Sequence, residues 1–159
     1  MGKTLVAYFS ASGITEALAQ RLADVAGADL FEIKPKTPYS TADQDWTNPN
    51  SRSSVEMNDK AFRPPIADDA KVENMADYDT IYLGFPIWWY VAPTIINTFL
   101  EQYDLTGKKI IPFATSGSSG MGNTNAGLVN SCKGANLIDG KRFSATAGEA
   151  ELKAWIDSI

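Results

Sequence analysis

Hydrophobic residues along the chain fall alternately into short continuous runs and into stretches with helical spacing. Residues 5–9 form a continuous apolar run within a strand expected at 4–9, and a helical pattern follows almost at once. The residues with this helical spacing are Ile14, Leu18, Leu22, Val25 and Ala26. Gly27 then stands where a glycine commonly ends a helix in the left-handed conformation. The pattern predicts a buried strand followed by an amphipathic helix.

The same alternation continues to the end of the chain. Further strands are expected at 30–33, 79–86 and 109–114, and further helices at 91–103, 122–133 and 152–159. Residues 136–138 and 141–144 flank an Asp-Gly pair, which predicts either a last strand with a bulge or a small hairpin. Continuous apolar strands between helices indicate a parallel sheet covered on both faces, a doubly wound α/β fold.

The range 35–77, here called the insert, interrupts this alternation. Its periodicity is weak, it contains several prolines, and only 67–75 has the pattern of a short helix. Loops of this length in compact domains are usually functional or disordered. Trp46, Met57 and Phe62 argue against full disorder, so we expect the insert to be ordered.

Length and net charge indicate how many domains the chain forms and which binding partners are disfavoured. The chain has 159 residues, which predicts a single domain spanning 1–159, and its net charge of −5 disfavours nucleic acid and anionic membranes as partners. A basic protein is the more natural partner. No apolar run reaches the roughly 18 residues of a membrane span. No signal-peptide pattern opens the sequence, so we expect a cytoplasmic protein, as a monomer or a weak dimer.

The chain contains no histidine and one cysteine, Cys132. This composition excludes a disulfide within the chain, a His/Cys zinc site and a Ser-His or Cys-His nucleophile pair. We therefore expect no metal site and no catalytic side chain of these kinds. Cys132 is expected to be a buried apolar residue rather than a reactive thiol.

Three loops leave the carboxyl ends of predicted strands, where ligands bind in sheets of this kind. In the first, residues 10–15, three hydroxyls and Gly13 stand where the strand becomes a helix, so the helix N-terminus can hold a phosphate. No Lys or Arg lies between Lys3 and Arg21, and neither the P-loop nor the three-glycine dinucleotide fingerprint is present. An ordinary Ser/Thr helix cap is the alternative interpretation.

The other two loops differ in chemistry. Residues 87–90 read Ile-Trp-Trp-Tyr, and at least one of these aromatic rings is expected at a surface or in a cleft, where an indole suits a flat conjugated ligand. The alternative is a hydrophobic lid over the following helix. Residues 115–122 are rich in Gly and Ser, which fits close approach to a polar ligand edge. By composition alone this loop also resembles a flexible linker.

Taken in order, these motifs resemble those of the flavodoxin-like family, in particular its short members with an elongated segment after the second strand. The resemblance covers essentially the whole chain and implies five strands in the order 2-1-3-4-5, with FMN where the strand order reverses. It implies that Ser10, Ser12, Gly13, Ile14 and Thr15 hold the phosphate. It places Pro86, Ile87, Trp88, Trp89 and Tyr90 along the flavin ring, and Ser116, Gly117, Ser118 and Gly120 at its pyrimidine edge.

The resemblance implies an FMN protein that passes electrons, received from a redox partner protein or from NAD(P)H. A small NAD(P)H-dependent FMN or quinone reductase and a non-catalytic protein-binding domain are the alternatives. Two departures argue against strong stabilisation of the flavin semiquinone. Residues 86–90 contain no glycine, and the third loop lacks the acidic residues and the tyrosine of many electron carriers.

The insert is expected to fold over the ring side of this site, ordered by packing of Trp46 and Phe62. Arg52 and Arg63 could then meet an anionic nicotinamide cofactor or pair with carboxylates of the protein itself. Surface arginines more commonly form ordinary ion pairs with carboxylates.

Overall fold

The computed structural model describes residues 3–11, 13–45, 47–59, 61–69, 71–88, 91–116 and 120–159. The sheet contains β1 (Lys3–Tyr8), β2 (Asp29–Glu32), β3 (Tyr78–Pro86), β4 (Lys109–Thr115), β5 (Asn136–Leu137) and β6 (Lys141–Phe143). The helices are α1 (Ile14–Ala26), α2 (Arg52–Met57), α3 (Thr94–Glu101), α4 (Thr124–Leu128) and α5 (Glu149–Ser158). Short 3-10 turns cover Ala42–Gln44, Met75–Asp77 and Val129–Ser131.

The strands run in the order β2-β1-β3-β4-β5, and every pairing is parallel. The fold class and strand order predicted from the sequence are therefore confirmed. The fifth position in the sheet is shared by two short strands, because β6 also pairs with β4 in parallel. This arrangement excludes the hairpin alternative and corresponds to a last strand that is interrupted.

Pro112 explains where the last strand breaks. The ladder from β4 to β5 ends at Ile110 and resumes with β6 at Phe113, whereas the ladder to β3 is continuous. The carbonyl of Ile110, two residues earlier, accepts from Ile138 on this outer side. Pro112 faces the same way and has no N–H to donate. Gly140 fills the gap, and a Cβ on it would lie 2.1 Å from the Pro112 carbonyl oxygen.

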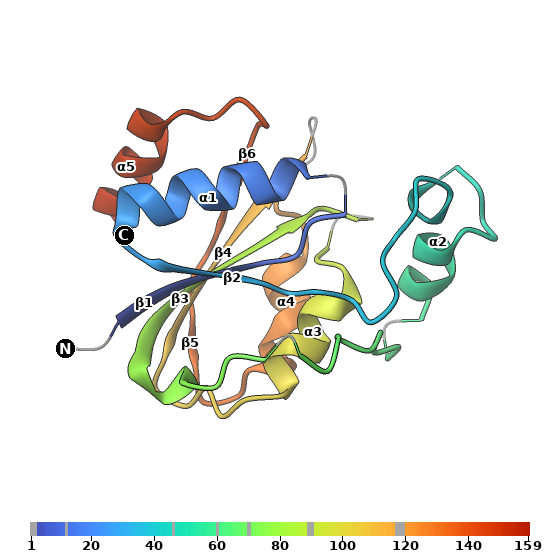
Figure 1. Cartoon of the computed structure of the whole chain (residues 1–159), viewed down its shortest axis with the longest axis horizontal. Helices are drawn as coiled ribbons and strands as arrows, with labels where there is room; N and C mark the ends of the chain where they lie inside the picture. The colour runs from blue at the N-terminus through green and yellow to red at the C-terminus, as the bar shows by residue number, and fades with distance from the viewer. Residues whose placement is uncertain are drawn as a thin grey trace.

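Helices cover both faces of the sheet: α1 and α5 lie on one face, and α3 and α4 lie on the other (Figure 1). Side chains of β1 alternate between them, so Val6 and Tyr8 pack towards α1 and α5 while Leu5, Ala7 and Phe9 pack towards α3. Residues facing either way are buried, which accounts for the continuous apolar run in the sequence.

The helix boundaries follow the sequence pattern closely at some ends. Gly27 ends α1 with φ of 63°, and its N–H donates to the Ala23 carbonyl, as the sequence predicts. Within α1, however, Ile14 is 46% exposed, and Thr15 takes a buried position beside it. The helix predicted at 122–133 is also shorter, since α4 ends at Leu128 and continues only as a 3-10 turn.

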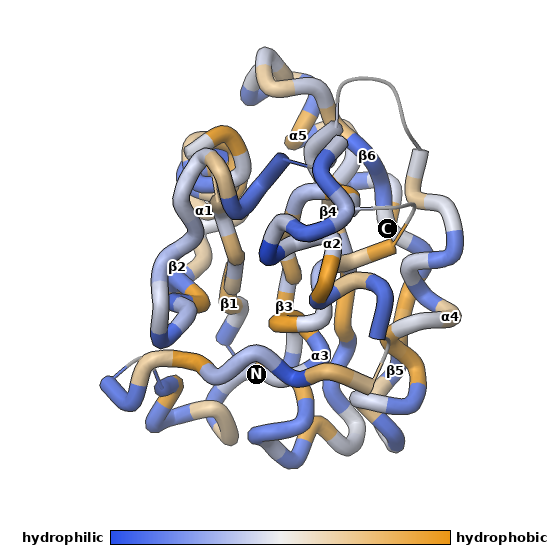
Figure 2. Tube along the Cα trace, turned by 90° about the vertical axis from the view of Figure 1, so that its right-hand side faces the viewer, coloured by the Kyte–Doolittle hydropathy of each residue, from blue (hydrophilic) through white to orange (hydrophobic). Residues whose placement is uncertain are grey.

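The start of the insert is fastened to a later part of it, residues 65–67. Pro35 and Ile66 form an antiparallel bridge, and the N–H groups of Lys36 and Ala67 donate to Pro65 and Lys34 across it. Residues 36–65 therefore form a loop that leaves and rejoins the domain at one place. Between these ends it carries α2, which lies beyond the carboxyl ends of the strands (Figures 1 and 2).

The short helix predicted at 67–75 is wrong for the described part of that range. The structure has turns there and a 3-10 turn only from Met75 to Asp77. Val72 and Met75 are buried in the core, and the Val72 N–H donates to the Tyr103 hydroxyl at 2.9 Å. Contacts with α3 and its following turn thus replace the hydrogen bonds that a local helix would make.

Candidate functional site

Three loops meet at the carboxyl edge of the sheet, which faces the viewer in Figure 2. The Ile87 N–H, just after β3, donates to the Thr115 carbonyl at the end of β4, at 3.1 Å. The hydroxyls of Thr15 and Thr115 are hydrogen-bonded at 2.8 Å. One residue of β4 therefore connects the first loop with the aromatic loop.

The first loop leads from β1 into α1 through a glycine in the left-handed conformation. Gly13 precedes α1 with φ of 89°, a conformation that favours glycine, and no side chain among the described residues caps the helix. The Gly13 N–H donates instead to the Ser10 hydroxyl oxygen at 3.0 Å. The described side chains thus leave the first N–H groups of α1 available at its positive end. Ser12 lies outside the described residues.

The aromatic loop begins with half-buried Pro86 and Ile87 and continues to Trp88, which exchanges two backbone hydrogen bonds with Val91. The Trp88 indole meets Phe9 edge-on, at 5.8 Å between ring centroids, and also meets Tyr39 of the insert at 5.4 Å. Trp88 therefore belongs to an aromatic cluster at the site. Trp89 and Tyr90, which the sequence also places here, lie outside the described residues.

The third loop is anchored by a residue that sequence reasoning missed. Arg142 on β6 donates from Nε to the Ser116 hydroxyl at 3.1 Å and from Nη2 to the Ser116 carbonyl at 2.7 Å. No sequence signal connects positions 116 and 142, because only the parallel pairing of β4 with β6 brings them together. Gly120 is exposed, whereas Gly117 and Ser118 lie outside the described residues.

If Arg142 holds this loop in its binding conformation, Arg142→Gln should weaken the binding of FMN and riboflavin alike. We expect a loss of about 1.5–3 kcal/mol, the range for hydrogen bonds that involve a charged group. Flavin fluorescence titration measures both affinities. Arg21→Gln is the matched control, because Arg21 donates to the carbonyls of Ala145 and Ala147 on the α1–α5 face of the sheet. Equal effects of the two substitutions would contradict the assigned role.

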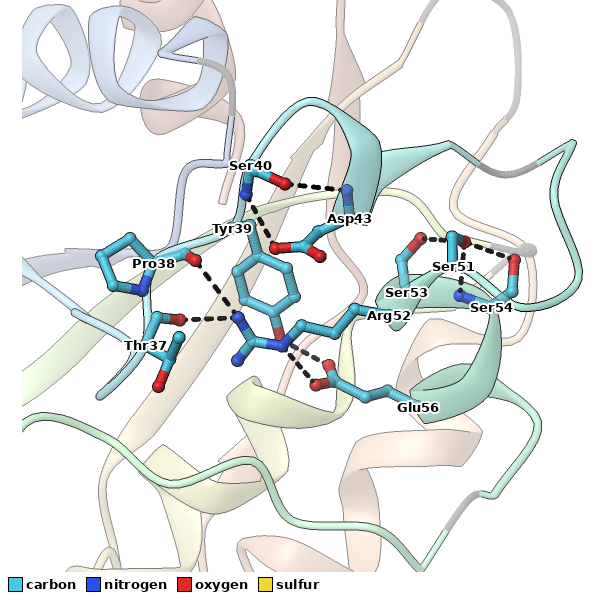
Figure 3. A network of polar contacts seen from close by, with 10 residues as sticks. All are labelled: Thr37, Pro38, Tyr39, Ser40, Asp43, Ser51, Arg52, Ser53, Ser54 and Glu56. Atoms are coloured by element: carbon cyan, nitrogen blue, oxygen red, sulfur yellow. Dashed lines mark hydrogen bonds and ion pairs between the residues drawn. The ribbon is translucent and has the colours of Figure 1, made fainter.

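A polar network holds the insert in place around Tyr39 (Figure 3). The Tyr39 hydroxyl donates a short hydrogen bond to Glu56, and Arg52 Nε donates to the same carboxylate at 2.8 Å. The Arg52 guanidinium lies 3.8 Å from the centroid of the Tyr39 ring and also donates to the Thr37 carbonyl at 2.7 Å. Arg52 therefore connects α2 to the segment that precedes it.

Serines complete the start of α2. The Ser51 hydroxyl oxygen accepts from the Ser54 N–H at 3.3 Å, which is the usual N-cap bond. Ser51, Ser53 and Ser54 are all buried, although they lie in a segment on the periphery of the fold. The cap and the i,i+4 pair of Arg52 with Glu56 together account for a helix of only six residues.

Tyr39 connects the insert with the aromatic loop. Burial and the hydrogen bond to Glu56 raise the pKa of the Tyr39 hydroxyl well above its usual value, so it remains a neutral donor. Its ring packs edge-on against both Phe9 and Trp88. Gln44 of the insert also donates to the Ala11 carbonyl in the first loop, at 3.3 Å. The insert thus touches two of the three loops.

The expected role of Phe62 in ordering the insert is wrong, because Phe62 is 40% exposed. Tyr39 packs against the aromatic loop and orders the insert instead. Trp46 lies outside the described residues. Arg52 and Arg63 both form ion pairs, Arg52 with Glu56 and Arg63 with Glu101 at 2.9 Å. The ion-pair alternative for these two arginines is confirmed.

Cys132 is buried, and burial raises the pKa of its thiol, in agreement with the structural role predicted for it. The described residues contain no group of three or more His, Cys, Asp or Glu side chains that could hold a metal ion. Within the same residues, no helix combines the length and the apolar character needed to cross a membrane.

The sequence and the fold are similar to those of known proteins. The flavodoxin family profile matches residues 3–159, and the chain belongs to that family. A Bacteroides eggerthii DSM 20697 protein assigned as a flavoprotein is 46% identical, with a TM-score of 0.92 over 100% of this chain and 98% of that one. A similarly assigned Bacteroides uniformis ATCC 8492 protein is 47% identical, with a TM-score of 0.92 over 98% of each chain.

A more distant solved structure shares the fold. The flavoprotein of Lactobacillus acidophilus NCFM, in complex with FMN, is 24% identical to this chain. Its TM-score is 0.70, over 98% of this chain and 99% of that one. At this level of identity the likeness concerns the fold.

Proposed function

We propose that this protein carries non-covalently bound FMN and passes electrons through it, as the flavodoxin resemblance implies. FMN is the cofactor of the family to which the chain belongs. The observation that carries the assignment is the meeting of three strand-end loops, joined through Thr115, at the edge where such sheets bind ligands. The FMN complex of the Lactobacillus acidophilus flavoprotein agrees with it.

The described residues fit the chemistry of the phosphate group. The uncapped N-terminus of α1 offers backbone N–H donors, and Ser10 and Thr15 add hydroxyls. The Thr15 hydroxyl can accept from Thr115 while it donates to a phosphate oxygen, so one group both anchors the loop and binds the ligand. No cation is needed for a phosphate that is held and not transferred.

The ring side fits a flat conjugated group. Trp88 is only partly buried and is fixed by Phe9 and Tyr39, so it can present an indole without reorganisation. Arg142 fixes Ser116 where the resemblance places the pyrimidine edge. The flavin supplies the redox chemistry when bound, and these residues would orient it and exclude water.

Ligand titration tests the assignment directly. The protein should bind one FMN per chain and be yellow. Thr15→Val should weaken the binding of FMN by about 1.5–3 kcal/mol, because it removes a hydrogen bond to a charged group. Riboflavin, which lacks the phosphate, should bind Thr15→Val almost as well as the original protein.

Thr115→Val is the matched control, since it breaks the same hydroxyl pair without removing the expected phosphate ligand. Thr115→Val should reduce the affinity for FMN less than Thr15→Val does. A colourless protein that takes up no FMN would refute the proposed function, and a non-catalytic binding domain would become the better interpretation. Equal losses for FMN and riboflavin would show that the first loop is not the phosphate site.

The electron donor separates the carrier from a small NAD(P)H-dependent reductase. Arg52 and Arg63, the two arginines of the insert that could meet a nicotinamide cofactor, both form ion pairs with carboxylates of the protein. This observation favours a carrier that receives its electrons from another protein. A reductase is favoured by a cavity of about 550 Å³ whose lining includes Val91 and Asn123, which follow the aromatic loop and the third loop. Stopped-flow reduction of the FMN-loaded protein by NADH and NADPH decides between them, because a carrier should be reduced negligibly by either.

A further inference from the structure

Tyr39 joins an aromatic ring of the site to a carboxylate of the insert. Its ring meets the Trp88 indole edge-on, with 5.4 Å between the centroids and 72° between the planes. Its hydroxyl donates a hydrogen bond to the Glu56 carboxylate of α2 (Figure 3). Rings in contact allow an electron to pass between them, and a proton transfers to an acceptor within hydrogen-bond reach. Tyr39 can therefore exchange an electron with one neighbour and a proton with the other.

Among the described residues, Tyr39 is the tyrosine that has both contacts. The Tyr82 ring meets the Trp155 ring at 5.6 Å, which is a similar geometry, but burial alone raises the pKa of its hydroxyl and no described carboxylate accepts from it. The Tyr8 hydroxyl donates to Glu16 at 3.1 Å, but its ring contacts no described tryptophan ring. These two tyrosines separate the effect of the indole from the effect of the carboxylate.

The surroundings of Tyr39 require its proton to leave when an electron leaves. The Arg52 guanidinium lies 3.8 Å from the centroid of the Tyr39 ring, so a positive charge left on that ring would be repelled. Arg52 Nε also donates to the Glu56 carboxylate at 2.8 Å and holds it in place beside the tyrosine. Release of the hydroxyl proton to Glu56 leaves the ring uncharged.

We propose that Tyr39 and Glu56 form a proton-coupled electron relay that removes an oxidising equivalent from Trp88. A strong one-electron oxidant, either photoexcited flavin or a small diffusing radical, takes one electron from Trp88 and leaves the indole as a radical cation. One electron then passes from Tyr39 to Trp88, the O–H bond of Tyr39 breaks, and its proton forms a bond to a Glu56 carboxylate oxygen. Trp88 is restored, Tyr39 becomes a neutral radical and Glu56 a neutral acid.

The relay protects the aromatic contacts of the site. Trp88 packs against both Phe9 and Tyr39, and irreversible oxidation of its indole would destroy that packing. When a small thiol returns one electron to Tyr39 and becomes a thiyl radical, Glu56 returns the proton and the relay is restored. Only the choice of flavin as an oxidant rests on the proposed function, since the resemblance places Trp88 along the flavin ring.

Pulse radiolysis with the azidyl radical, which oxidises tryptophan side chains, tests the relay in the FMN-loaded protein. The absorbance of a tyrosyl radical should grow as that of the tryptophan radical decays. Tyr39→Phe keeps the ring and should remove most of this growth, whereas Tyr8→Phe and Tyr82→Phe, the matched controls, should leave it unchanged. Growth that survives Tyr39→Phe, or that Tyr82→Phe reduces as much, would overturn the proposal.

Substitution of the two neighbours tests the two transfers separately. Trp88→Phe keeps an aromatic ring against Tyr39 and should also remove most of the growth. If Tyr39 is oxidised equally fast without Trp88, it is oxidised directly and the relay falls. Glu56→Gln keeps the shape of the acceptor without its basicity, and it should slow the growth at least about a hundredfold, the lower end of what a positioned proton acceptor contributes.

The solvent isotope tests the proton transfer without any substitution. Growth of the tyrosyl radical in the original protein should be slower in D₂O than in H₂O, because the O–H bond of Tyr39 breaks in the step. Equal rates in the two solvents, or an unchanged rate in Glu56→Gln, would contradict the role of Glu56 as proton acceptor.

Flash excitation of the FMN-loaded protein distinguishes the two oxidants. A tyrosyl radical that follows the flash in the original protein and is absent in Tyr39→Phe identifies flavin as an oxidant of Trp88. A tyrosyl radical that forms with azidyl alone supports the relay with a diffusing radical as its oxidant. If the protein binds no FMN, the proposed function fails, and pulse radiolysis of the FMN-free protein still tests the relay.

Discussion

Glu56→Ala is expected to destabilise the insert by about 1–3 kcal/mol, since hydrogen-bond donors of Tyr39 and Arg52 lose their acceptor. The Glu56 side chain is 7% exposed, and it accepts from both Tyr39 and Arg52. Its loss removes the acceptor of the partly buried Tyr39 hydroxyl and of Arg52 Nε at once. The rate of limited proteolysis within the insert, together with thermal unfolding, measures the effect.

The same substitution should reach the flavin site. Tyr39 packs on Trp88, so release of Tyr39 should reduce the affinity for riboflavin and for FMN by similar factors. Asp157→Ala is the matched control, because Lys153 and Asp157 form an i,i+4 pair that is largely exposed and contributes little. Unchanged proteolysis in Glu56→Ala would mean that the network does not fasten the insert.

Gly140→Ala should lower the stability of the whole domain by about 1–3 kcal/mol or more, as overpacking of a filled interior does. A methyl group there would lie 2.1 Å from the Pro112 carbonyl oxygen, which belongs to the backbone and cannot rotate away. Chemical denaturation measures the change, with Gly148→Ala as the control. A Cβ on Gly148 would meet no atom within 4 Å, and Gly148 does not have a positive φ. Equal stability of the two variants would refute the steric role of Gly140.

The order of elements and the positions of the three loops could be predicted because their signals lie in residues that are neighbours in the sequence. A buried parallel strand leaves a continuous apolar run, and its carboxyl end leaves a loop of special composition at a known edge of the sheet. Even the end of α1 at Gly27 depends only on local backbone conformation. The first loop could therefore be assigned before any contact was known.

The residues that escaped prediction act through contacts between distant positions. Arg142 reaches Ser116 only because β6 pairs with β4, and Tyr39 reaches Trp88 only because of the path of the insert. The helix expected near Val72 is replaced by a bond to Tyr103. For α2, by contrast, the signals were present in Ser51 and in the spacing of Arg52 and Glu56.

The interrupted last strand also bears on how copies of the protein behave beside one another. A long unpaired strand at the border of a sheet is a template on which a second chain can add. Here one border is β2, four residues long, and the other is divided into pieces of two and three residues by the step at Gly140. Neither border offers a long row of unpaired donors and acceptors, so the same proline and glycine that divide the last strand also limit pairing with a second copy at that border.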